Sequence, residues 1–138
     1  MKQLLVLLYI GLCVGCASTK TIQSNYLNGV WIPIKQEMGG NELPSIAFAT
    51  QQLIISDSNY TFSAESIDKG ILKFSDNKID IYGKEGVNTG KHFTTIYKYE
   101  NELLTICYNL LGNSYPETFV TKNKPTLFLS VYKKAIKK

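Results

Sequence analysis

The side chains that most often carry out catalysis are few in this sequence, and they are scattered along it. His92 is the only histidine, which leaves neither a multi-histidine zinc site nor a histidine-based triad. Cys107 lies in an apolar run without a neighbouring cation, and this predicts a small buried hydrophobe rather than a nucleophile. Asp76 and Asp80 form a carboxylate pair of the kind that hydrolases use, but they fall at expected turns or strand ends, where acids are usually solvated. We therefore expect no catalytic residues, no metal and no cofactor, a solvated His92, and a protein that is not an enzyme.

A second kind of chemistry is indicated near the N-terminus. A short basic segment, residues 1–3, precedes an apolar run, residues 4–12, that is too short to span a bilayer comfortably. The run ends in the series Leu12-Cys13-Val14-Gly15-Cys16-Ala17-Ser18. This series resembles a bacterial lipoprotein lipobox, although Cys13 stands where the motif usually has leucine. The resemblance implies cleavage after Gly15 and acylation of the thiol and the amine of Cys16.

The lipobox defines the expected domain boundaries and the expected compartment. Residues 1–15 would be a signal peptide, residues 16–26 a lipidated cysteine and polar tether, and residues 27–138 the domain. An ordinary secretory signal and an uncleaved anchor are the alternatives. Several acyl chains would hold the protein durably at a membrane of the bacterial cell envelope. Because no acidic residue directly follows Cys16, we expect the outer membrane, facing the periplasm.

The charge of the chain limits its partners further. The net charge is +4, and all positive charge comes from lysine, since the sequence has no arginine. Arginine is the residue that makes bidentate contacts with phosphate, so its absence argues against a nucleic-acid site. The lysine excess is typical of a soluble surface or of attraction to an anionic membrane.

The rest of the chain has the pattern of short strands. Tyr60, Phe62 and Ala64 alternate with polar residues, which is the period of a strand that is wet on one side. Similar runs, separated by turn residues, predict strands over residues 30–38, 51–56, 59–66, 71–74, 78–82, 92–100, 102–108, 117–120 and 126–133. Residues 43–50 predict a short helical lid or an irregular loop. We expect an all-β, antiparallel barrel of about eight strands, because closure removes exposed strand edges.

A series of residues along the domain carries a family resemblance. It comprises Leu27-Asn28-Gly29-Val30-Trp31, Glu37, Gly40, Leu43-Pro44, Tyr60, Gly70, Ile79-Asp80, Gly86, Gly90-Lys91, Ile96-Tyr97, Leu104, Cys107, Pro116, Phe119 and Lys133. This series resembles a lipocalin-like domain family first catalogued as an uncharacterised Planctomycetes domain, over residues 27–134. The resemblance implies a calycin-type β-barrel, and the family has no established catalytic residues. It also implies a barrel plug, in which Trp31 of the Gly29-Val30-Trp31 series lies beneath a cation from the last strand. On that strand Leu127, Leu129, Val131 and Lys133 share one face. We expect this aliphatic face to look inward, which makes Lys133 the cation.

The expected role is binding. An aromatic-rich barrel tends either to enclose one small apolar ligand or to fill itself with side chains. Alternation and aromatic character select the candidate lumen residues Trp31, Tyr60, Phe62, Tyr97, Tyr99 and Phe119. The alternative is an envelope module for protein–protein interaction or inhibition with a filled core. The size of the barrel interior distinguishes the two.

Overall fold

The computed structural model of the chain describes residues 25–137, and these residues form one antiparallel sheet. The strands are β1 (Gly29–Met38), β2 (Asn41–Glu42), β3 (Gln52–Ser56), β4 (Asn59–Ser63), β5 (Ile67–Ser75), β6 (Lys78–Glu85), β7 (His92–Glu100), β8 (Leu103–Asn109) and β9 (Leu127–Lys134). Two 3₁₀ turns, η1 (Asn25–Leu27) and η2 (Ser45–Ala47), accompany them, and no α-helix occurs in the described residues. Cys16, the lipobox and residues 16–24 of the expected tether lie outside this range.

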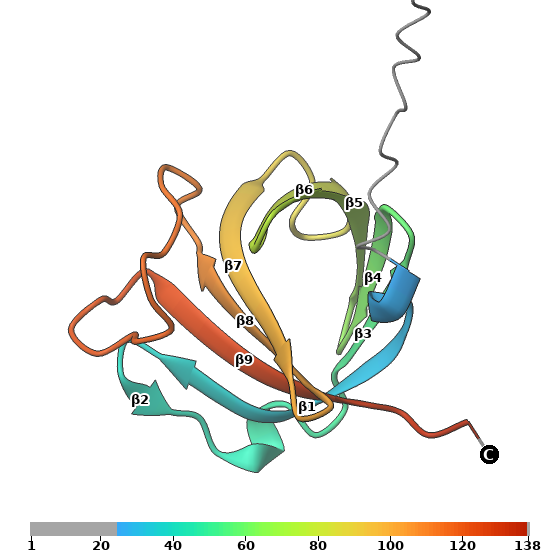
Figure 1. Ribbon diagram of the computed structural model, residues 1–138, viewed down its shortest axis with the longest axis horizontal. Coiled ribbons are helices and arrows are strands. Elements are labelled where there is room, and N and C mark those ends of the chain that lie inside the picture. Colours follow the sequence, from blue (N-terminus) through green and yellow to red (C-terminus); the bar gives the residue numbers. More distant parts are fainter. Residues whose placement is uncertain (1–24, 138) are drawn as a thin grey trace, which may run out of the picture.

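The sheet closes on itself into a barrel. Its strand order is β2-β1-β3-β4-β5-β6-β7-β8-β9, and β1 also pairs with β9. Only the two-residue strand β2 stands outside this ring, so eight strands make the barrel (Figure 1). Every pairing is antiparallel, and neighbours in the ring from β3 onward are also neighbours in the sequence. The prediction of an all-β, antiparallel, lipocalin-like barrel of about eight strands is therefore confirmed.

Two local expectations were wrong. Residues 68–70, expected to form a turn, lie inside β5, where they pair with β4. Residues 117–120, expected to form a strand, belong instead to the long connection between β8 and β9. In both places polar and apolar residues are mixed. Whether such a segment forms a strand depends on pairing with a neighbouring strand more than on local propensity.

The two ends of the barrel differ in how tightly the strands are joined. At one end, which we call the closed end, two-residue turns join β3 to β4, β5 to β6 and β7 to β8. Asp57, Asp76 and Asn101 in these turns have positive φ angles, a conformation that Asp and Asn tolerate better than most residues. At the other end, which we call the mouth, longer connections span residues 86–91 and 110–126. The mouth is therefore the end of the barrel that leaves room for access to the interior.

Trp31 occupies the closed end. Its side chain is fully buried, and its Nε1 donates a hydrogen bond to the carbonyl oxygen of Leu27 at 2.7 Å. The ring of Tyr99 packs edge-on against it, with centroids 5.9 Å apart. The Nζ of Lys134 lies 5.3 Å from the centre of the Trp31 ring. Gly29, with a φ of +139°, leaves the space in which the Lys134 side chain runs.

The cation over Trp31 is thus Lys134, and the expected position of Lys133 was wrong. That expectation placed the aliphatic row of β9 inside the barrel. The inward row is the other one, because Phe128 and Tyr132 line the interior while Leu129 packs outside. Lys134 continues the inward row and Lys133 the outward one, and both residues are exposed at the end of β9.

A second apolar cluster covers the outer face of β7, β8 and β9. Its buried members are Ile96, Cys107, Leu127 and Leu129, with Tyr115, Phe119 and Val131 packed against them. Tyr115 and Phe119 come from the 110–126 segment, which lies outside the ring of strands (orange in Figure 1). The segment is joined to β1, since Thr121 hydrogen-bonds to Glu37 and accepts from the backbone of Gly40. Strand β9 is therefore buried on both faces.

Candidate functional site

An apolar cavity of about 210 Å³ lies inside the barrel. Seven of the eight barrel strands and two connections at the mouth contribute to it. Its walls are Leu53, Ile55, Tyr60, Phe62, Leu72, Ile79, Ile81, Asn88, Phe93, Ile106, Tyr108, Leu110, Phe128 and Tyr132. Aliphatic and aromatic side chains with a few polar groups are the usual lining of a small-molecule site.

One glycine shapes this lining. Gly70 on β5 pairs with Tyr60 on β4, and the Tyr60 ring lies over it. A Cβ atom at Gly70 would come within 2.6 Å of the Tyr60 ring and 2.0 Å of the Tyr82 carbonyl oxygen. The absence of a side chain at Gly70 therefore allows Tyr60 to turn into the barrel.

Two tyrosine hydroxyls meet in the wall of the cavity. The Oη atoms of Tyr108 and Tyr132 are 3.0 Å apart and share a hydrogen bond. Burial raises the pKa of both hydroxyls above the ordinary value for tyrosine. Burial, followed by the charge of Asp68, also raises the pKa of Tyr60. These phenols are therefore neutral hydrogen-bonding groups at neutral pH.

The mouth carries a buried carboxylate. The side chain of Asp68 is 4% exposed and points into the barrel beside Phe62, its cross-strand partner. Its two oxygens accept hydrogen bonds from the backbone and the side-chain amide of Asn88, at 3.1 and 2.9 Å. The contact holds the 86–91 connection against the barrel, and Gly86 is packed so closely that a Cβ would lie 2.3 Å from Asp68. Asn88 is fixed in the cavity wall as a result.

The structure separates the six predicted lumen residues. Tyr60 and Phe62 lie in the cavity wall. Trp31 and Tyr97 belong to the same buried core but lie outside that wall, toward the closed end. Tyr99, 40% exposed, packs on Trp31 there. Phe119 lies outside the barrel in the second cluster, which corrects its expected position in the lumen.

Several wall residues were missed by sequence reasoning, notably Phe93, Tyr108, Phe128 and Tyr132. The signal for Phe128 and Tyr132 was present, since they share one face of β9. That face was assigned to the outside because the opposite face is more aliphatic. Phe93 lies on the same inward face of β7 as Tyr97, and Tyr108 on the same inward face of β8 as Ile106. Alternation along these two strands would have identified both residues.

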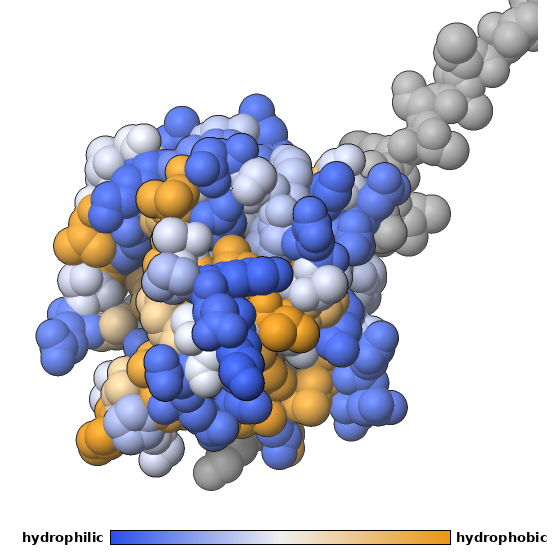
Figure 2. Space-filling view, turned by 90° about the vertical axis from the view of Figure 1, so that its left-hand side faces the viewer, coloured by the Kyte–Doolittle hydropathy of each residue, from blue (hydrophilic) through white to orange (hydrophobic). Residues whose placement is uncertain are grey.

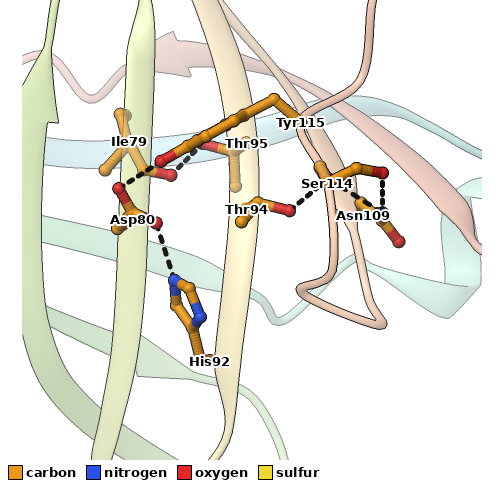
Figure 3. Close-up of polar contacts among 8 residues, drawn as sticks. All are labelled: Ile79, Asp80, His92, Thr94, Thr95, Asn109, Ser114 and Tyr115. Atoms are coloured by element: carbon orange, nitrogen blue, oxygen red, sulfur yellow. Dashed lines mark hydrogen bonds and ion pairs between the residues drawn. The ribbon is translucent and has the colours of Figure 1, made fainter.

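A polar cluster lies on the outside of β6 and β7 (Figure 3). Asp80 is at its centre, with its Oδ1 2.6 Å from Nε2 of His92 and its Oδ2 accepting a hydrogen bond from the Tyr115 hydroxyl at 2.6 Å. His92 stacks on Tyr82 at 4.5 Å between ring centroids. His92 is partly solvated, as expected, with 36% of its side chain exposed, but its ring is also paired with Asp80 and stacked on Tyr82. The hydrogen bond to Asp80, more than burial, raises the pKa of Tyr115 to about 12.

The geometry of this cluster suits a structural attachment. Thr94 donates to the carbonyl oxygen of Ser114, and Asn109 donates to the same oxygen, so three strands hold the start of the 110–126 segment (Figure 3). A histidine oriented by a carboxylate would act as a general base only beside a nucleophile or a bound water in a cleft. Asp80 and His92 instead contact each other, Tyr82 on the outer face of β6 and Tyr115 of the 110–126 segment.

Cys107 is fully buried in the second cluster, which confirms the prediction of a small buried hydrophobe. Burial raises the pKa of its thiol to about 11, so the unreactive protonated form dominates at neutral pH. Within residues 25–137, no group of three or more His, Cys, Asp or Glu side chains is arranged to hold a metal ion. In the same range, none of the helices has the length and apolar character needed to cross a membrane.

The outer surface around the 110–126 segment carries both hydrophobic and hydrophilic residues. On the face that is seen from the left-hand side of Figure 1, hydrophobic residues form separate groups divided by hydrophilic ones (Figure 2). A scattered distribution of this kind is normal for a protein surface and does not by itself mark an interface. The cavity is therefore the stronger candidate site.

Comparisons of the chain with protein-family models, with curated proteins and with solved structures found no match. The class of this protein is therefore defined by its fold and its cavity. The chain contains a small, closed, antiparallel β-barrel of the lipocalin-like type, with an apolar cavity that lies between a tryptophan-plugged end and a looser mouth.

Proposed function

We propose that this chain is a membrane-anchored lipoprotein whose barrel binds one small apolar ligand, and that it is not an enzyme. The observation that carries the proposal is the cavity of about 210 Å³ with its aliphatic and aromatic wall. An engineered apolar cavity of about 150 Å³ takes up benzene, so a ligand with roughly seven to nine non-hydrogen atoms matches this volume. That is smaller than the ligands of most small-molecule sites, which occupy cavities of about 300–1,000 Å³.

The alternative is an interaction or inhibitor module with a filled core. A cavity in the middle of the barrel weighs against a filled core, because well-packed interiors leave few voids larger than a water molecule. Exposed apolar side chains near the mouth, Val87 and Leu111 among them, serve equally well as the entrance for an apolar ligand. The binding proposal therefore accounts for both features.

The binding proposal has a direct test in native mass spectrometry. The full chain, purified in mild detergent and released gently in the gas phase, is expected to carry one small molecule or to take one up from a panel of single-ring hydrocarbons. The expected stoichiometry is one per chain, because a cavity of about 210 Å³ has room for one ligand of that size. A chain that stays ligand-free after exposure to the whole panel would contradict the proposal.

The anchor is tested at Cys16. Cys16→Ala removes the thiol that would be acylated, and we expect the variant protein to leave the membrane fraction, because most of the affinity for the bilayer would come from the acyl chains. Fractionation of cells that express either form measures this, with Cys13→Ala as the matched control that should stay membrane-bound. Retention of the Cys16→Ala chain in the membrane fraction would refute lipidation at this residue.

A further inference from the structure

The polar groups in the cavity wall carry information about the ligand. Tyr108 and Tyr132 share one hydrogen bond, and the two hydroxyls together hold two protons. Whichever way that bond runs, one phenolic proton is left over. No described hydrogen bond accepts it. Both residues line the cavity, so the remaining O–H group is available at the surface that a ligand would touch.

The surroundings disfavour a charged ligand. None of the described lysines lines the cavity, so a buried carboxylate or phosphate group would have no counter-ion there. The buried carboxylate of Asp68 lies at the mouth, and both of its oxygens are already bonded to Asn88. Burial keeps the two phenols protonated, so they offer a neutral donor to a neutral acceptor.

We propose that the cavity selects a small, uncharged, mainly apolar molecule that carries one hydrogen-bond acceptor, such as a carbonyl oxygen, and that the Tyr108–Tyr132 pair donates to this acceptor. This inference rests on the proposed binding function and adds the chemical class of the ligand. The cavity of about 210 Å³ sets the size of the apolar part, and the hydroxyl pair sets the position of the polar atom.

The test uses two probes of nearly the same shape. Acetophenone and α-methylstyrene differ only in a carbonyl oxygen that is replaced by a CH₂ group, and both match the cavity in size. Their affinities for the full chain and its variants are measured by NMR titration, and the ratio of the two affinities is the readout. A ratio cancels differences in stability and in cavity volume between variants.

The variants remove the donor in steps. Tyr108→Phe and Tyr132→Phe each leave one hydroxyl with its proton, so each should retain most of the preference for acetophenone. The double variant Tyr108→Phe/Tyr132→Phe has no phenolic donor, and we expect its affinity ratio to shift roughly tenfold against acetophenone. Tyr115→Phe, which changes a tyrosine on the outer face, is the matched control and should leave the ratio unchanged.

A second measurement covers the case in which the double variant does not fold. The carbonyl stretch of acetophenone bound to the unaltered chain is expected at a lower infrared frequency than in hexane, because a hydrogen bond weakens the C=O bond. An unshifted band, or a double variant with an unchanged ratio, would overturn the inference and leave the binding function standing. Failure of both probes to bind the unaltered chain would overturn the two together.

Discussion

Replacing Trp31 with alanine is expected to lower the free energy of unfolding by about 3–5 kcal/mol, the largest loss for any single side chain in this barrel. The side chain is fully buried, and its removal would leave a large void at the closed end. It would also leave the carbonyl oxygen of Leu27 without its 2.7 Å hydrogen bond and Tyr99 without its aromatic partner. Since domains of this size are stable by about 5–15 kcal/mol, the variant should be marginal at physiological temperature.

Urea unfolding followed by circular dichroism measures the loss, because Trp31 is the only tryptophan and its fluorescence disappears with it. Trp31→Phe should cost clearly less, since most of the packing is kept.

The two lysines that end β9 provide a matched pair of smaller changes. Lys134→Ala should cost about 0.5–1 kcal/mol through the lost contact with the Trp31 ring, while Lys133→Ala should cost almost nothing. The reverse order would show that Lys133 caps the plug.

The class of fold could be predicted from the sequence because it depends on patterns that are repeated many times. Turn residues separate the strand-like runs at regular spacing, and Asp57 and Asp76 mark hairpins that the structure contains. Errors at single places, such as the turn expected at residues 68–70, do not change the ring of strands. The tryptophan plug was expected from the resemblance that the Gly29-Val30-Trp31 series carries, and this series opens β1.

The inward face of the last strand could not be predicted in the same way. Alternation identifies the buried face only where the other face meets water. On β9 the 110–126 segment covers the outer face, so Leu129 and Phe128 are both shielded from solvent to a large degree, on opposite sides. The choice of the aliphatic row then placed Lys133 wrongly. Phe119 was misplaced for another reason, because residues 117–120 were expected to form a strand of the barrel. Knowledge that a long connection folds back on the sheet would be needed to avoid this error.

The cavity wall was only partly predictable for a related reason. Tyr60 and Phe62 lie on a strand with a wet outer face, and alternation placed them correctly. Whether a barrel of this size is filled or hollow depends on the way in which side chains from all strands meet at its centre. Gly70 and the Asp68–Asn88 contact affect that outcome through close approaches that no periodicity reveals.

Filling the cavity is the second change for which we expect a large effect. Leu72 on β5 is 4% exposed and lies in the wall, so Leu72→Trp would place an indole ring in the space that a ligand would occupy. The overpacking itself costs about 1–3 kcal/mol, which the domain should tolerate. Binding of a single-ring ligand should then fall by at least about a hundredfold, because roughly half the ligand contacts are displaced and every 1.4 kcal/mol is tenfold.

The control for this change is the same substitution on the other side of the sheet. Leu103 on β8 is half-buried and does not line the cavity, so Leu103→Trp adds the same side chain without entering the interior. It should keep ligand affinity within about a factor of two of the unaltered chain. Circular dichroism of both variants checks that the barrel is intact.

The measurement that tests the central claim most directly is therefore an NMR titration of the full chain, Leu72→Trp and Leu103→Trp with toluene. The expected result is saturable binding to the unaltered chain and to Leu103→Trp, with shifts at Tyr60, Phe62 and Ile106, and no binding to Leu72→Trp. Equal binding to all three proteins, or binding to none of them, would contradict the claim that this barrel holds a small apolar ligand in its interior.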